Sequence, residues 1–398
     1  MKKGIRETSL LLIMFLISLN QYAQDSVIDT LDSHIYNKKQ LETLLEKPPC
    51  LEGYRPNQSG PLSRLDLPFD TPPDSTFTIE RIRIPSDGFL INGWLYLPLG
   101  SEKHPLVVLT NGGGDGSRPL KSLSNWLAPV LAHCGIAAFV HDKRGTGESE
   151  GIFAETIYDD YVSDAGNCAI FLSNHSRIDS ANIGVIGGSE GGRIAVLTAS
   201  RYPIVKFVVS FAGTVVSTVD DRINAQKNWL HSLNLSDTIY KEVLSLHIKS
   251  IKAWASNDPV NHKKVNEEIS ELRKKFDSQI LPFTKQEMDS IQEFVAVLPT
   301  WYSLPNDYLS ELEHFNKKWL AIFGEADQVV PTLASVKNIV YYMSISGNKD
   351  YQIAVIPNCG HAPVNIETKR MIRLDNIILN WLNEDVIISN SQCNRCIN

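Results

Sequence analysis

The chain has 398 residues and a formal net charge of -7, and 43% of its residues are hydrophobic and 21% charged. These fractions are those of an ordinary globular protein, and the length allows one large domain with an insertion or two domains. The mild negative charge, without basic runs interleaved with aromatic residues, argues against nucleic acid as a partner.

The N-terminus has the pattern of a secretory signal peptide over residues 1–23. Lys2, Lys3 and Arg6 precede an apolar run at residues 10–19, which is too short to span a bilayer. Ala23 supplies a small residue at the expected cleavage site. Because no cysteine lies near that site, we expect export without a lipid anchor, and no stable membrane span once the segment is removed.

An N-terminal extension follows over residues 24–74, with one predicted helix at 38–46 and a proline-rich stretch. Two β-rich runs then lie at 77–84 and 90–97. The sequence Pro85-Ser86-Asp87-Gly88 between them is typical of a turn, so the two runs predict a hairpin.

Short apolar runs alternate with helical patterns beyond the hairpin. Strands are predicted at 106–109, 136–140, 183–186, 205–211, 320–323 and 353–356, and helices at 120–131, 157–172, 193–201 and 371–382. This alternation predicts an α/β fold with a mostly parallel central sheet and helices on both faces, over residues 75–213 and 317–386. Residues 214–316 have helical periodicity and predict a helical cap insertion over the carboxyl edge of the strands. Residues 387–398 are a polar tail.

The six cysteines permit disulfides in an exported protein, but their pairing stays open. Cys134 and Cys168 lie on helical patterns and are interpreted as core residues. Cys393 and Cys396 form a C-x-x-C pair in the tail, with no second pair or histidines to make a zinc site.

A G-x-S-x-G motif at residues 187–191 follows a predicted strand and precedes a predicted helix. In this context the serine stands on a strained strand-to-helix turn, so that its hydroxyl is exposed. Side chains at Gly187 or Gly191 would collide where helix and strand cross. Ser189 is therefore the candidate nucleophile, although an ordinary loop serine is the alternative for the pentapeptide taken alone.

The loop at 110–116 follows a strand and contains Gly112, Gly113, Gly114 and Gly116. An oxyanion needs two backbone N–H donors, and we expect these from Gly113 and from Glu190, the residue after the nucleophile. A phosphate-binding loop is the rival interpretation, but the stretch matches neither G-x-G-x-x-G nor a Gly-Lys-Ser/Thr ending.

A serine nucleophile needs a base, and the base needs an orienting acid. Asp327 follows the strand at 320–323, and His361 follows the last strand, so both should emerge at the same edge as Ser189. Other candidate acids are Asp220, Asp221 and Glu325; Asp327 is the best placed after its strand. The chain order Ser, Asp, His is that of α/β-hydrolases.

The sequence Asp142-Lys143-Arg144-Gly145-Thr146-Gly147-Glu148-Ser149 follows another predicted strand. Its glycines and charges are compatible with a binding site. We interpret it as a structural turn, in which Asp142 and Arg144 brace the loop beneath the active edge.

This turn, the Gly-Gly-Ser-Glu-Gly-Gly elbow, the Gly-x-x-Asp-x-x-Val-Pro acid loop and the final Gly-His resemble secreted bacterial α/β-hydrolase esterases, relatives of the prolyl oligopeptidase and dienelactone hydrolase group. The resemblance covers about residues 75–213 and 317–385. It implies the α/β-hydrolase fold and a Ser-His-Asp triad. The chain departs from many relatives at Asn111, where they have histidine, and at Gly188, where histidine or tryptophan is common.

These features predict an exported serine hydrolase that cleaves small-molecule carboxylic esters through an acyl-enzyme, with catalytic Ser189, Asp327 and His361. No cofactor and no metal are expected. A serine peptidase, thioesterase or acyltransferase on the same fold is the alternative, and a non-catalytic binding protein is a third hypothesis. Trp254, Trp301, Tyr302 and Tyr308 of the insertion either line a pocket or form its own small core.

Overall fold

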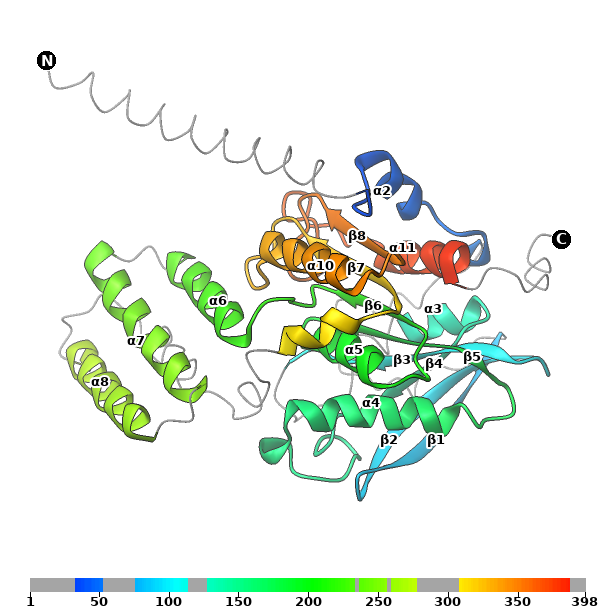
Figure 1. Cartoon of the computed structure of the whole chain (residues 1–398), viewed down its shortest axis with the longest axis horizontal. Coiled ribbons are helices and arrows are strands. Elements are labelled where there is room, and N and C mark those ends of the chain that lie inside the picture. Colours follow the sequence, from blue (N-terminus) through cyan, green and yellow to red (C-terminus); the bar gives the residue numbers. More distant parts are fainter. Residues whose placement is uncertain are drawn as a thin grey trace, which may run out of the picture.

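The structure is a computed structural model that describes residues 33–52, 76–113, 127–232, 236–255, 259–277 and 308–386. Its centre is an eight-stranded sheet of order β1-β2-β4-β3-β5-β6-β7-β8 (Figure 1). The strands are β1 (Phe77–Ser86), β2 (Phe89–Pro98), β3 (His104–Thr110), β4 (Ala137–His141), β5 (Ile178–Gly188), β6 (Phe207–Phe211), β7 (Lys318–Gly324) and β8 (Tyr351–Ile356). The strands β3 to β8 pair in parallel, which confirms the predicted mostly parallel sheet.

The hairpin of β1 and β2 forms the antiparallel edge of the sheet, and β2 also pairs antiparallel with β4. Its two-residue turn consists of Asp87 and Gly88, which both have positive φ, of 47° and 87°. This backbone fits the twist of two antiparallel strands and favours an Asp-Gly pair. The hairpin predicted from the turn sequence is confirmed.

Helices cover both faces of the sheet and bury its apolar side chains. One face is covered by α4 (Tyr158–Leu172), α5 (Glu190–Arg201) and α10 (Thr332–Ser346). The other face is covered by α2 (Lys38–Leu45), α3 (Leu127–His133) and α11 (Leu374–Trp381). The strands are nearly continuous apolar runs because both of their faces are buried.

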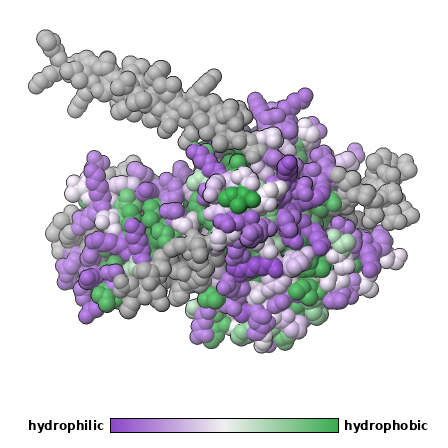
Figure 2. Space-filling view, in the orientation of Figure 1, coloured by the Kyte–Doolittle hydropathy of each residue, from purple (hydrophilic) through white to green (hydrophobic). Residues whose placement is uncertain are grey.

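Among the described residues between β6 and β7, the helices are α6 (Thr218–Ser232), α7 (Asp237–Ala255) and α8 (Pro259–Asp277), at the left in Figure 1. Figure 2 shows hydrophilic and apolar side chains interspersed over this part of the molecule. The 3-10 segment η5 (Tyr308–His314) leads back to the sheet. Its Tyr308 is buried and donates a hydrogen bond to the Val216 carbonyl, so this aromatic residue is part of the packing.

Within the described ranges, every helix is too short or too polar to cross a bilayer.

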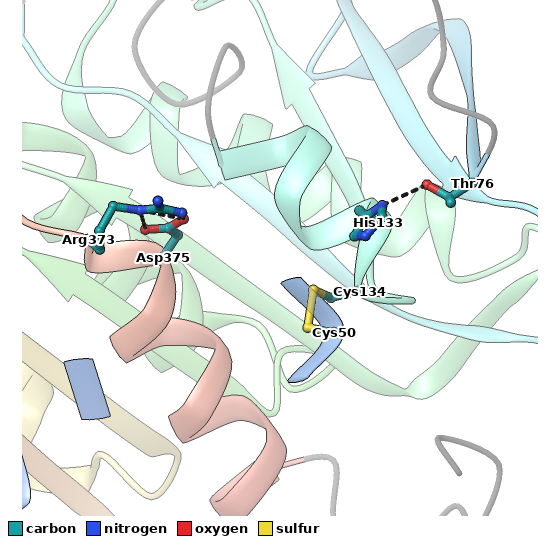
Figure 3. Close-up of a disulfide and its surroundings, with 6 residues drawn as sticks. All are labelled: Cys50, Thr76, His133, Cys134, Arg373 and Asp375. Carbon is teal, nitrogen blue, oxygen red and sulfur yellow. Dashed lines mark hydrogen bonds and ion pairs between the residues drawn. A yellow bond between two sulfur atoms is a disulfide. The ribbon is translucent and has the colours of Figure 1, made fainter. Parts of the chain in front are cut away.

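Cys50 and Cys134 form a disulfide that ties the N-terminal extension to the end of α3 (Figure 3). The prediction that Cys134 is a plain core residue is therefore wrong, since the extension packs against α3 and brings Cys50 to it. Cys168 is fully buried, as predicted. The tail with Cys393 and Cys396 lies outside the described residues.

Replacing Cys50 and Cys134 together by serine should lower the free energy of unfolding. The bond joins residues 84 positions apart, and in the chain-entropy model a cross-link of that span stabilises by about 4.5 kcal/mol. Thermal unfolding should show a lower Tm for the double variant, and reductant should lower the Tm of the wild type alone. An equal Tm for both proteins would exclude this stabilising role.

His247 on α7 should make stability fall at acid pH. Burial lowers the pKa of His247 to about 4, from 6.5. The unfolded chain therefore binds more protons between pH 6.5 and pH 4, so the free energy of unfolding drops as the pH falls through this window, by about 3 kcal/mol at most. Thermal melts at pH 7.5 and 5 should show a smaller acid shift for His247→Phe than for the wild type; equal shifts would refute this assignment.

Candidate active site

The carboxyl ends of the parallel strands bring the predicted site residues to one edge of the sheet. Ser189 follows β5, Asp327 follows β7 and His361 follows β8. The glycine loop follows β3, so its first residues lie at the same edge. Ligands of open α/β sheets bind at the carboxyl edge, at the point where the strand order reverses. Here β3 and β4 lie on one side of β5, and β6 lies on the other side.

Ser189 stands on a strained turn between β5 and α5. Its backbone has φ 55° and ψ -124°, a region that residues other than glycine rarely occupy. The Ser189 N–H donates to the Phe211 carbonyl at 2.8 Å, which fixes the turn to β6. A Cβ added at Gly187 would lie 2.1 Å from the Gly191 carbonyl oxygen, which confirms the collision predicted for this crossing.

Three predicted residues meet in one hydrogen-bonded chain. The Nε2 atom of His361 lies 3.0 Å from the Ser189 hydroxyl oxygen, and its Nδ1 atom lies 2.9 Å from Oδ2 of Asp327. The Asp327 side chain is fully buried, and 30% of the His361 side chain is exposed. The carboxylate is thus shielded from water, while the imidazole remains partly exposed.

The contact with Asp327 determines which ring nitrogen of His361 donates a hydrogen bond. A carboxylate only accepts hydrogen bonds, so Nδ1 of His361 donates to it and Nε2 of the neutral ring accepts from the Ser189 hydroxyl. The other oxygen of Asp327 accepts from the backbone N–H groups of Val329 and Val330, at 2.8 and 2.9 Å. These contacts hold the carboxylate in the orientation that a serine base requires.

The competing acids have other contacts. Asp220 accepts from the Ser217 hydroxyl, and Asp221 forms an ion pair with Arg193. Glu325 accepts from the Asn358 N–H at 3.0 Å and so links the acid loop to the histidine loop. Of the four candidates, Asp327 is the one in hydrogen-bond contact with His361.

The glycine loop lies directly against the elbow. A Cβ added at Gly112 would lie 3.5 Å from the Ser189 Cβ, and one added at Gly113 would lie 2.8 Å from Oε2 of Glu190. The structure therefore brings Gly113 and Glu190, the two predicted oxyanion donors, together beside Ser189. Loop residues beyond Gly113 up to the start of α3 lie outside the described residues.

Sequence reasoning missed Lys143, which contacts both sides of this arrangement. Its ammonium donates to the Gly112 carbonyl at 2.7 Å and lies 3.3 Å from Oε2 of Glu190. The side chains of Lys143 and Glu190 are only 10% and 7% exposed. The residue type alone, a lysine between Asp142 and Arg144, does not indicate a functional role. Its position after β4, at the carboxyl edge of the sheet, is the feature that could have indicated it.

The neighbours of Lys143 brace the turn, as predicted. Arg144 is buried and forms ion pairs with Asp160 and Asp164 of α4. Burial raises the pKa of Asp164, although its hydrogen bonds with Arg144 and Ser86 oppose this effect. Asp142 accepts from the Glu148 N–H at 3.1 Å, which closes the turn on itself.

Helix α6 contacts two parts of the site, helix α5 and the loop that carries Asp327. Asp221 of α6 pairs with the buried Arg193, which lies on α5 one turn after Ser189. Asn224 and Asn228 of α6 donate to the backbone carbonyls of Val329 and Gln328 in the acid loop. Helix α6 therefore connects helix α5, which follows Ser189, with the loop that carries Asp327.

Cys359 is a buried thiol two residues before His361. Burial, assisted by the charge of Asp327, raises the pKa of Cys359 to about 11, above the ordinary value of 9.0. The thiolate is the reactive form of cysteine, so the raised pKa disfavours Cys359 as a nucleophile at physiological pH.

Comparison with known proteins identifies a family. The model of a family described as serine aminopeptidase, S33, matches residues 101–368. An uncharacterized 31.7 kDa protein of the traX-finO intergenic region of Escherichia coli is 30% identical over 146 residues, which are 35% of this chain and 49% of that protein. Thiohydrolase aneE of Aspergillus aculeatus is 28% identical over 133 residues, 33% of this chain and 40% of its own length.

The chain thus spans less than half the length of these two curated relatives. Among solved structures, an esterase of Pyrococcus furiosus superposes with a TM-score of 0.50 and 14% identity, over 77% of this chain and 92% of the esterase. At this identity the likeness shows the fold alone.

Proposed function

The chain belongs to the serine aminopeptidase family S33 of α/β-hydrolases, and from this premise we propose that it is an exported serine hydrolase that cleaves carboxylic esters through an acyl-enzyme. The observation that carries the proposal is the hydrogen-bonded chain from the Ser189 hydroxyl through His361 to Asp327. That arrangement is the one by which a serine becomes a nucleophile at neutral pH.

In the proposed reaction the Ser189 oxygen attacks the ester carbonyl carbon while Nε2 of His361 takes the hydroxyl proton. The buried Asp327 carboxylate stabilises the imidazolium that forms. The negative oxygen of the tetrahedral intermediate is held by the backbone N–H groups of Gly113 and Glu190. His361 then protonates the leaving alcohol, and water, activated by the same imidazole, releases the acid and restores Ser189.

An ester is favoured over a substrate with a free amino terminus by the state of Glu190. An enzyme that removes amino-terminal residues needs negative charge to bind the substrate ammonium. The Glu190 carboxylate lies beside the elbow, but it is nearly buried and is already paired with Lys143 at 3.3 Å. Its charge is therefore compensated within the protein.

Thioesters are the second candidate substrates. The named thiohydrolases among the relatives support this alternative, with 28% and 31% identity over about a third of this chain. The acyl-enzyme chemistry is shared, because the same oxyanion forms when the leaving group is a thiol.

A substrate panel tests the ester assignment. Matched acetyl and butyryl esters, thioesters and aminoacyl anilides should be compared by kcat/KM on the mature protein. We expect the esters to lead. A preference for thioesters would favour the second candidate, a thioesterase. Cleavage of the anilides alone would overturn the ester assignment.

Export is supported by the predicted signal peptide at residues 1–23 and by the Cys50–Cys134 disulfide, since such bonds persist in oxidising compartments. The signal segment lies outside the described residues. The mature protein should begin at Gln24 when recovered from the periplasm or medium. Recovery from the cytoplasm with Met1 and the signal segment intact would contradict export.

A further inference from the structure

Lys143 connects the two backbone segments that flank Ser189. Its ammonium contacts the Gly112 carbonyl oxygen at 2.7 Å and the Glu190 carboxylate at 3.3 Å, and it lies 4.9 Å from the centre of the Tyr161 ring. Gly112 lies in the loop after β3, Glu190 begins α5 and Tyr161 lies on α4, while Lys143 itself follows β4. Three parts of the fold therefore contact one cation that a fourth part carries.

The contact with Gly112 determines where the next N–H points. Peptide units are planar and, among the described residues, all trans, so the Gly112 carbonyl and the Gly113 N–H share one plane and point in opposite directions. A cation that holds the carbonyl on one side thereby orients the N–H on the other side. It also polarises the peptide unit, which strengthens the N–H as a donor.

We propose that Lys143 is the positioning residue of the oxyanion hole: by holding the Gly112 carbonyl and the Glu190 carboxylate, it sets the Gly113 and Glu190 N–H groups toward the substrate carbonyl oxygen on Ser189. The inference rests on the proposed serine hydrolase function. Glu190 contributes its backbone N–H to the hole and its side chain to the brace, and a Cβ added at Gly113 would lie 2.8 Å from Oε2 of that side chain, so the carboxylate would have to shift.

Stability alone does not account for the pair. Charges that are 10% and 7% exposed lose much of their hydration, and apolar residues of similar volume commonly stabilise a fold equally well. A buried ion pair next to both N–H donors is explained by its effect on them. It holds the two N–H groups in place before the reaction, so their dipoles need not rearrange during it.

The test is Lys143→Met, which keeps the aliphatic stem and removes the cation. We expect kcat for p-nitrophenyl acetate to fall about 100-fold, the loss typical of a disabled oxyanion donor, with KM within about twofold of wild type. A purely structural role does not predict a split of this kind between kcat and KM.

A second readout uses an ester and its thiono analogue, in which sulfur replaces the carbonyl oxygen. Sulfur accepts weaker hydrogen bonds, so the wild-type preference for the oxygen ester measures the quality of the hole. Lys143→Met should reduce this ratio of kcat/KM values. A loss of folded protein would lower both values equally and leave the ratio unchanged.

Two further variants separate positioning from folding. In Lys143→Met/Glu190→Gln no buried charge is left unpaired, so Tm should return toward wild type while kcat stays low. Arg201→Met removes two ion pairs, with Glu311 and with Asp159, at the far end of the same helix α5, and should keep the wild-type kcat and the wild-type ratio of kcat/KM values.

Wild-type kcat and an unchanged ratio in both Lys143 variants would overturn the positioning role and leave the hydrolase assignment standing. If the wild-type protein itself turns over neither ester nor thiono analogue, the proposed function fails and the inference fails with it.

Discussion

Ser189→Ala is expected to lower kcat for an activated ester by about 10⁶-fold, the loss seen when a triad serine is removed. Alanine has no oxygen to attack the carbonyl, so His361 loses the proton that it would accept at 3.0 Å. The fold should persist, because the strained turn is held by the backbone bond from residue 189 to Phe211 and by the glycines around it. The initial rate with p-nitrophenyl acetate measures the effect.

The matched control is Ser344→Ala, on the exposed side of α10, where the hydroxyl contacts only a backbone carbonyl one turn earlier among the described groups. That variant should keep wild-type kcat. Residual turnover by Ser189→Ala above about a hundredth of the wild-type rate would mean that another group serves as the nucleophile.

Asp327→Asn should cost about 10⁴-fold in kcat with little change in KM. The amide oxygen of the variant side chain can still accept from the Val329 and Val330 N–H groups, which places the amide NH₂ against Nδ1 of His361. The ring nitrogen must then accept, so the proton moves to Nε2 and faces the Ser189 hydroxyl. The histidine is left in the tautomer that cannot take the serine proton.

Asp220→Asn is the control, because Asp220 is a candidate acid from sequence and contacts Ser217 in the structure. It should leave kcat within about threefold of wild type, as expected for a surface substitution. If Asp220→Asn proves more damaging than Asp327→Asn, the orienting acid has been assigned incorrectly.

The meeting of Ser189, Asp327 and His361 could be predicted because it follows from the order of the strands along the chain. Buried parallel strands are visible as apolar runs, and residues just after their carboxyl ends meet at one edge of the sheet. Ser189, Asp327 and His361 each follow such a run, so three local patterns were sufficient to place them together.

Lys143 was not predicted because its role depends on contacts from distant segments. Its partners Gly112 and Glu190 are 31 and 47 positions away. Local pattern identified only the turn, which Asp142 and Arg144 do brace. The same limit applies to the disulfide, since the packing of the extension against α3 decides which cysteine Cys50 meets.

Helix α10 was missed although a signal exists. Val336, Ile339 and Met343 recur at spacings of three and four after Pro331, which is the pattern of a helix with one buried face.

The strand β5 begins at Ile178, five residues before its predicted start, because residues 179–182 are polar or small and lie at the exposed end of the strand. Apolar periodicity finds the buried part of an element and not its solvated end.

The most direct measurement of the central claim is the site of covalent labelling by a fluorophosphonate, located by peptide mass spectrometry. Ser189 lies in the tryptic peptide of residues 178–193, which also contains Ser180 and so carries an internal control. We expect one adduct per chain, on Ser189, and protection from labelling by prior incubation with excess ester. An adduct on any other residue, or a folded protein that takes up no label, would contradict the assignment of Ser189 as the nucleophile.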